Sequence, residues 1–164
     1  MHFEIEHDFS ASREQVAATL CDPAFQTELD LPDLSRPEVI ESSNDGTTRV
    51  LRLRYEYIGQ LDPIARKVIG GRKLTWIQEL RLDSETYAGT LTFAAESDAS
   101  RLNGEANVAI VGIDTNTSRR RIAGDFHVKV PLIGGTAERK IVPGLTRRLD
   151  AEAEALAAEI AART

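Results

Sequence analysis

Residues 135–163, GTAERKIVPGLTRRLDAEAEALAAEIAAR, form the longest stretch of the sequence with helical periodicity. Apolar side chains recur there every three or four residues, which predicts an amphipathic helix with one apolar stripe. The stripe consists of Ala137, Ile141, Leu145, Leu149, Leu156 and Ile160. Pro143 removes one helical hydrogen bond, so we expect the helix to be kinked or split there. We interpret the charged residues of the segment, among them Arg147, Arg148 and Glu152, as its outer face.

Apolar and polar residues alternate in most of the chain before this helix, which predicts strands with one buried face. The clearest strand is 47–57, in which Leu51, Leu53, Tyr55 and Tyr57 share a face. Asn44-Asp45-Gly46 is a strong hairpin signal in front of it. Further strands are predicted over residues 2–9, 38–43, 74–82, 87–95, 102–113 and 118–130. Because an apolar sheet face needs a cover, we predict an α+β fold in which a curved antiparallel sheet of six to seven strands surrounds the long C-terminal helix.

Three short helices are expected in addition. Ser12 and Gln15 form a capping box, and Asp22 with Pro23 starts a second helix. The third helix spans residues 62–69, between two strands, with Gly70-Gly71 at its end. At one end of a cavity this insertion could be a lid with Gly70-Gly71 as its hinge, or a fixed plug that completes the core.

Length and composition fit one domain over residues 1–164. The hydrophobic share of 41% and the charged share of 28% are those of a globular protein. A net charge of -6 argues against nucleic acid as a partner, since phosphate binding needs a basic face. One cysteine, Cys21, excludes an intramolecular disulfide, and we expect it to be a small packing residue. No signal peptide and no apolar run of about 20 residues is seen, so we expect a cytoplasmic protein without stable membrane insertion.

The order of these elements resembles that of the START-like superfamily, also called the Bet v 1-like or helix-grip fold. Within it the chain resembles a family of uncharacterised actinobacterial proteins. Three stretches carry this narrower resemblance: FSAS at 9–12, PIARKVIG at 63–70 and VKVPLIGG at 128–135. The superfamily implies an internal cavity for a lipid, sterol, polyketide or plant hormone, and a few members are cyclases or hydrolases. The narrower family implies no catalytic residues.

The sequence leaves the size of such a cavity open. Aromatic residues make up only 5% of the chain, and the small residues at inward positions, Gly89, Gly104, Ala106 and Gly124, could leave volume for a ligand. The same glycines could instead permit sheet curvature and close packing. The candidate ligand-binding residues are His7, Leu53, Tyr55, Tyr57, Ile64, Val68, Trp76, Gln78, Tyr87, Leu91, Phe93, Phe126, Ile141 and Leu145. Their polar members could orient a ligand or pair with one another.

No motif for a catalytic site, a metal or a cofactor is found. The run Arg119-Arg120-Arg121 is interpreted as a solvated hairpin balanced by nearby acids, although with Arg147-Arg148 it could touch anionic lipid headgroups. Three functions remain open. The first is binding, sequestration or transfer of a small hydrophobic ligand. The second is a cyclase or aromatase in which His7 or a tyrosine donates a proton, and the third is an interaction module with a filled core.

Overall fold

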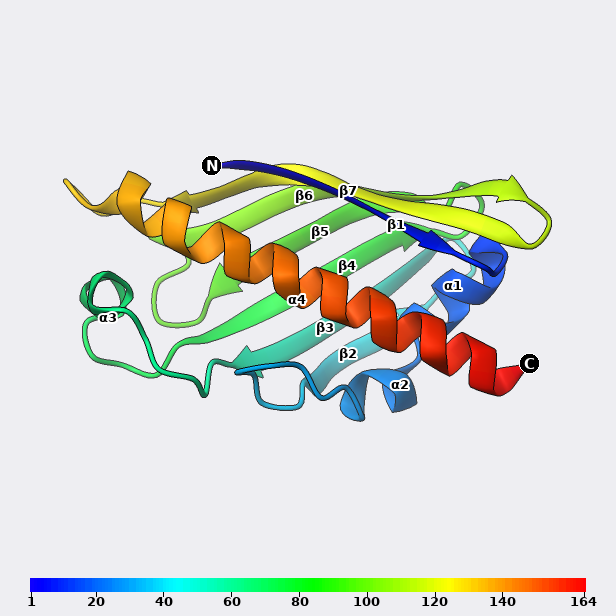
Figure 1. Ribbon diagram of the computed structural model, residues 1–164, viewed down its shortest axis with the longest axis horizontal. Helices are drawn as coiled ribbons and strands as arrows, with labels where there is room; N and C mark the ends of the chain where they lie inside the picture. The colour runs from blue at the N-terminus through cyan, green and yellow to red at the C-terminus, as the bar shows by residue number, and fades with distance from the viewer.

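The computed structural model describes residues 1–164 and contains one sheet and four helices (Figure 1). The strands are β1 (His2–Phe9), β2 (Glu38–Asn44), β3 (Thr48–Glu56), β4 (Thr75–Asp83), β5 (Ala88–Ala95), β6 (Leu102–Asp114) and β7 (Thr117–Val128). The helices are α1 (Arg13–Leu20), α2 (Pro23–Thr27), α3 (Pro63–Ile69) and α4 (Gly134–Arg163). All neighbouring strands are antiparallel, in the order β1-β7-β6-β5-β4-β3-β2. The first strand, β1, therefore lies at one edge of the sheet and pairs with the last strand, β7.

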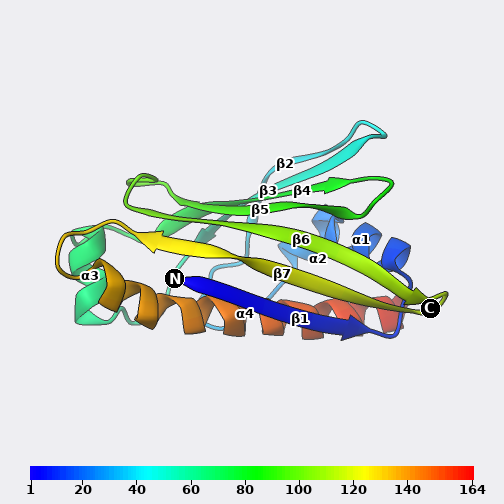
Figure 2. The same ribbon diagram turned by 90° about the horizontal axis from the view of Figure 1, so that it is seen from above.

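The sheet curves over α4, which crosses one of its faces along the length of the molecule (Figures 1 and 2). Helices α1 and α2 lie at one end of the sheet, and α3 lies at the other end, beside the start of α4 (Figure 1). The core between sheet and helix comprises 32 buried residues. This arrangement confirms the predicted helix-grip architecture, with seven strands.

The local signals in the sequence explain where the elements begin. The Ser12 and Gln15 side chains form the expected capping box at α1. The carboxylate of Asp62 accepts a hydrogen bond from the Ile64 amide at 2.8 Å and caps α3. Gly46 has a φ of 87° in the turn between β2 and β3, a conformation that glycine adopts without strain.

Helix α4 is a single helix of 30 residues that contains Pro143, so of the two expected effects of the proline, a kink or a split, the split does not occur. Pro143 and Arg139, four residues before it, both lie on the exposed side of the helix. Water can therefore reach the carbonyl group that Pro143 leaves without a donor, which lowers the cost of the proline.

The inward glycines do not leave the volume that a ligand would need. A methyl group at Gly124 would overlap the Glu105 carbonyl oxygen, and one at Gly89 would overlap the Arg81 carbonyl oxygen. At Gly104 the space is taken by the rings of Phe126 and Phe93, 3.0 and 3.2 Å away. These glycines allow strands and side chains to approach closely, which is the second of the two roles considered above.

None of the helices is long and apolar enough to span a membrane.

Candidate functional site

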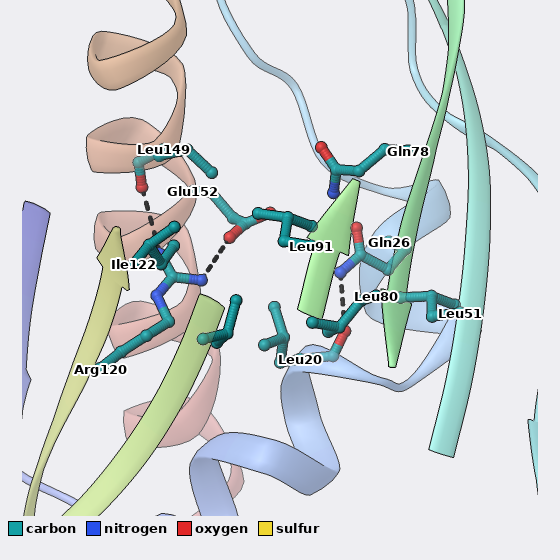
Figure 3. Close-up of a pocket in the computed structure, with 11 residues that line it drawn as sticks. Leu20, Gln26, Leu51, Gln78, Leu80, Leu91, Arg120, Ile122, Leu149 and Glu152 are labelled. Atoms are coloured by element: carbon teal, nitrogen blue, oxygen red, sulfur yellow. Dashed lines mark hydrogen bonds and ion pairs between the residues drawn. The ribbon is translucent and has the colours of Figure 1, made fainter. Parts of the chain in front are cut away.

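The interior between the sheet and α4 contains an ion pair. Arg120 on β7 and Glu152 on α4 are 2% and 3% exposed, and Arg120 Nη1 donates to Glu152 Oε1 at 2.5 Å (Figure 3). Arg120 Nη2 also donates to the Leu149 carbonyl oxygen at 3.3 Å. The interpretation of the arginine run as a solvated hairpin was therefore wrong at Arg120. Its neighbours Arg119 and Arg121 do lie on the outer face, where they pair with acids of β1.

A second arginine, Arg148 on α4, is buried without a carboxylate partner. Its residue exposure is 6%, and Nη2 donates to Gln78 Oε1 on β4 at 2.6 Å. The guanidinium carbon lies 5.2 Å from the ring centre of Tyr55 and 5.8 Å from that of Phe93. Its Nε and Nη1 have no hydrogen-bond partner. The expectation that Arg148 and Glu152 lie on the outer face of α4 was therefore wrong, whereas Arg147 is exposed.

The aromatic partner of Arg148 is itself fully buried. Tyr55 on β3 stacks on Trp76 of β4 with ring centres 5.5 Å apart. Its hydroxyl has no hydrogen-bond partner. Burial raises the pKa of this hydroxyl, and the nearby Arg148 guanidinium opposes the rise only in part. Tyr55 therefore remains protonated and offers a hydrogen-bond donor to the interior.

The ring of His7 on β1 is engaged at both nitrogens. Nε2 lies 2.7 Å from Asp150 Oδ1, and Nδ1 lies 3.2 Å from Arg120 Nη2. Because a guanidinium only donates hydrogen bonds, Nδ1 accepts from Arg120 and Nε2 donates to Asp150. His7 therefore orients Arg120, and neither nitrogen is free to exchange a proton with a substrate. This geometry counts against a cyclase in which His7 is the proton donor.

The enclosed space beside these residues is small, and Arg148 and Tyr55 do not line it. A cavity of about 20 Å³ lies between α1, α2, β3–β7 and α4, which is room for about one water molecule (Figure 3). Its lining residues are Leu20, Gln26, Leu51, Gln78, Leu80, Leu91, Val108, Arg120, Ile122, Leu149 and Glu152. Gln26 Nε2 donates to the Leu20 carbonyl oxygen at 2.7 Å, while Gln26 Oε1 has no partner. The conformation is closed, so the expected ligand-sized cavity is not open.

The structure brings most of the candidate ligand-binding residues to one face of the sheet. The buried members on β3, β4, β5 and β7 are Leu53, Tyr55, Gln78, Leu91, Phe93 and Phe126. The partly buried apolar members at the margin of the core are Tyr57, Ile64, Trp76, Ile141 and Leu145. Only Gln78 and Leu91 line the small cavity.

Two further candidates contact the same core away from the small cavity, Val68 as a member of the core and Tyr87 packed against it. Tyr87 precedes β5 in a left-handed conformation with a φ of 57°, and its ring is covered by Arg13 of α1, 4.6 Å away. The predicted strand 87–95 therefore begins one residue too early. Val68 is a buried residue of α3 and contributes to a surface hollow of about 300 Å³ that also contains Arg72, Asp98 and Arg101.

The sequence contained a signal for the three charged residues that were missed. Arg120 is in phase with Ile122, two residues on, which was expected to point inward. Arg148 and Glu152 precede Leu156 at intervals of four, so they lie on its side of the helix. The periodicity therefore placed them inside, and their charge alone led to the opposite interpretation.

Comparison with known proteins places these features in a family. The sequence model of a family described as "Protein of unknown function (DUF2505)" matches residues 4–160. No protein with a curated description matches the sequence.

Solved structures share the fold at low sequence identity. An aromatase/cyclase, Zhui from Streptomyces sp. R1128, is 17% identical with a TM-score of 0.67, over 99% of this chain and 94% of that one. Norcoclaurine synthase from Thalictrum flavum is 17% identical with a TM-score of 0.63, over 99% and 95%. A START superfamily protein from Mycobacterium smegmatis is 16% identical with a TM-score of 0.53, over 99% of each chain. The chain therefore has the START-like, Bet v 1-like fold.

Proposed function

Since the chain belongs to the DUF2505 family, whose function is unknown, we propose a function from its interior: binding of a small amphipathic ligand between the sheet and α4. The observation that carries the proposal is a group of buried polar atoms without partners: Gln26 Oε1, the Tyr55 hydroxyl, Arg120 Nε, and Arg148 Nε and Nη1. Buried polar atoms in proteins nearly always have partners. Acceptor atoms at the polar end of a ligand would pair with the donors of this group, and apolar side chains of the sheet would cover the body of the ligand.

The fold supports this proposal. Solved structures that share it include an aromatase/cyclase and a norcoclaurine synthase in complex with a transition state analogue. The apolar wall would favour binding by removing ligand surface from water, at about 25 cal/mol per Å².

A ligand larger than water requires the closed interior to open, and α3 is a candidate for the element that moves. It ends at Gly70 and Gly71, both with positive φ, which can act as a hinge. The N-cap residue of α3, Asp62, forms an ion pair with Lys140 of α4, in which Oδ2 and Nζ are 3.1 Å apart. This ion pair is exposed to water and therefore weak. We propose that α3 is the lid, and that ligands enter between it and the partly buried Ile141 and Leu145 of α4.

Native mass spectrometry of the protein purified from its own host tests the proposal. The expected result is a stoichiometric adduct that is released as an organic compound on denaturation. A clean apo mass, together with no change in melting temperature across a panel of lipids and aromatic compounds, would contradict ligand binding.

One observation favours a second candidate. A cavity of only about 20 Å³ is what an interaction module with a filled core would have. In that case α3 would be a fixed plug, and partner proteins rather than small molecules would co-purify with the chain. For either function we propose a cytoplasmic location, with transient membrane contact during ligand loading in the first case.

A further inference from the structure

We infer that the ligand is a carboxylic acid with an apolar body, and that its carboxylate pairs with Arg148. The inference rests on the proposed ligand binding and specifies the chemistry of that same site.

The first step is the balance of charge inside the protein. The interior contains two guanidinium groups, those of Arg120 and Arg148, and one carboxylate, that of Glu152. Arg120 and Glu152 pair with each other at 2.5 Å, so the charge of Arg148 remains without a counterion. A buried charge without a partner is strongly unfavourable. A ligand with a single negative charge would neutralise it, whereas a phosphate dianion would leave an unbalanced negative charge in its place.

The second step is the kind of hydrogen-bonding atoms that are free. Arg148 Nε and Nη1 carry only donors, and the Tyr55 hydroxyl keeps its proton. The ligand group that these atoms need is therefore an acceptor. A carboxylate accepts several hydrogen bonds at once and matches the planar guanidinium, which a hydroxyl or a ketone does less well.

The third step is the surroundings of the guanidinium. Tyr55 and Phe93 lie within 6 Å of it, and Trp76 stacks on Tyr55. Toward α3 the apolar side chains of Ile141 and Leu145 are partly buried against the core. The body of the ligand would therefore be apolar.

A purely structural role for Arg148 makes a different prediction. Gln78 and the two aromatic rings could be sufficient partners for the guanidinium. In that case a ligand, if one binds, would not distinguish an acid from the neutral compound of the same shape.

The experiment measures how tightly matched pairs of ligands bind to the natural chain and to matched variants at pH 7.5, where the acids are ionised. The pairs are dodecanoic acid with dodecan-1-ol, and 2-naphthoic acid with 2-naphthalenemethanol. Binding is measured by equilibrium dialysis and by the fluorescence of Trp76, which contacts Tyr55. The variants are Arg148→Met, which keeps the length without the charge, Arg148→Lys, which keeps the charge, and Arg147→Met, an exposed neighbour, as the control.

We expect at least one acid to bind more tightly than its alcohol. Arg148→Met should weaken acid binding by about 10-fold to 100-fold and leave alcohol binding unchanged. Arg148→Lys should retain part of the preference, and Arg147→Met should behave as the natural chain. Circular dichroism and the unchanged binding of the alcohol show that the Met variant is folded.

The two proposals fail in different ways. Equal binding of acid and alcohol, or equal loss of both in Arg148→Met, would overturn the carboxylate inference and leave ligand binding intact. No saturable binding of any of the four compounds to the natural chain would overturn both.

Discussion

At the scale of single residues, charge was a poor guide to position. The alternation of β7 and the period of α4 correctly indicated which side chains point inward, but Arg120, Arg148 and Glu152 were assigned to the surface because charged residues are seldom buried. The pairing of Arg120 with Glu152 joins residues 32 positions apart, and the two become neighbours only when α4 lies on the sheet. Local patterns along the sequence carry no information about such a pair.

The ion pair makes a testable prediction. Glu152→Gln should lower the free energy of unfolding by about 3 kcal/mol, because Arg120 then remains buried without a counterion. Glu154→Gln on the exposed side of the same helix is the matched control and should change stability by less than about 0.5 kcal/mol. Urea unfolding at pH 7 measures both. The double variant Arg120→Met, Glu152→Leu should recover most of the loss, and equal losses in the two single variants would argue against a buried pair.

At the scale of elements, the sequence was informative. All seven strands and four helices lie where alternation, caps and turn residues predicted them, with boundaries shifted by one or a few residues. These signals are local, so they are readable in one sequence. The role of the glycines was not readable in this way, because whether a glycine leaves space or fills it depends on the distance to the next strand.

Gly124 provides the test at this scale. Gly124→Ala should destabilise the protein by about 3 kcal/mol, since the added methyl group overlaps the backbone of β6 at Glu105 and Ala106. Gly135→Ala in the first turn of α4 is the control, because the new methyl group would lie at an ordinary 3.7 Å from Arg139. Denaturant midpoints report the difference. A Gly124→Ala variant as stable as the control would show that free volume does exist beside β7.

At the scale of the whole molecule, the fold was predictable and the contents of the interior were not. Solved structures at 17% identity or less have the same fold, so the architecture depends on the order and patterning of elements rather than on particular residues. The enclosed volume depends instead on the rotamers of a few large side chains and on the position of α3. Those are properties of the packed molecule, and the closed cavity of about 20 Å³ is one outcome of that packing.

The stability of the whole molecule should fall in alkaline solution, and two groups give the reason: the partly buried Cys21 thiol and the buried Tyr55 hydroxyl. Burial raises the pKa of the Cys21 thiol from its ordinary value of 9.0 to about 11, and it also raises the pKa of Tyr55 above its ordinary value of 10.0. Between pH 9 and 11 the unfolded chain therefore releases the thiol proton while the folded chain retains it. The unfolded state then binds fewer protons, so the free energy of unfolding decreases as pH rises.

The thiol contributes a loss of at most about 1.4 kcal/mol per pH unit in this window, and Tyr55 adds to it only above pH 10. Urea unfolding at pH 8, 9, 10 and 10.5 should show a shallower decline for Cys21→Ala than for the natural chain, beginning near pH 9. Tyr55→Phe should become shallower only at the two highest values. Contributions of the lysines and of the other two tyrosines are common to all three proteins and cancel in the comparison. Parallel curves for the natural chain and Cys21→Ala would mean that the thiol is as accessible to water in the folded protein as in the unfolded chain.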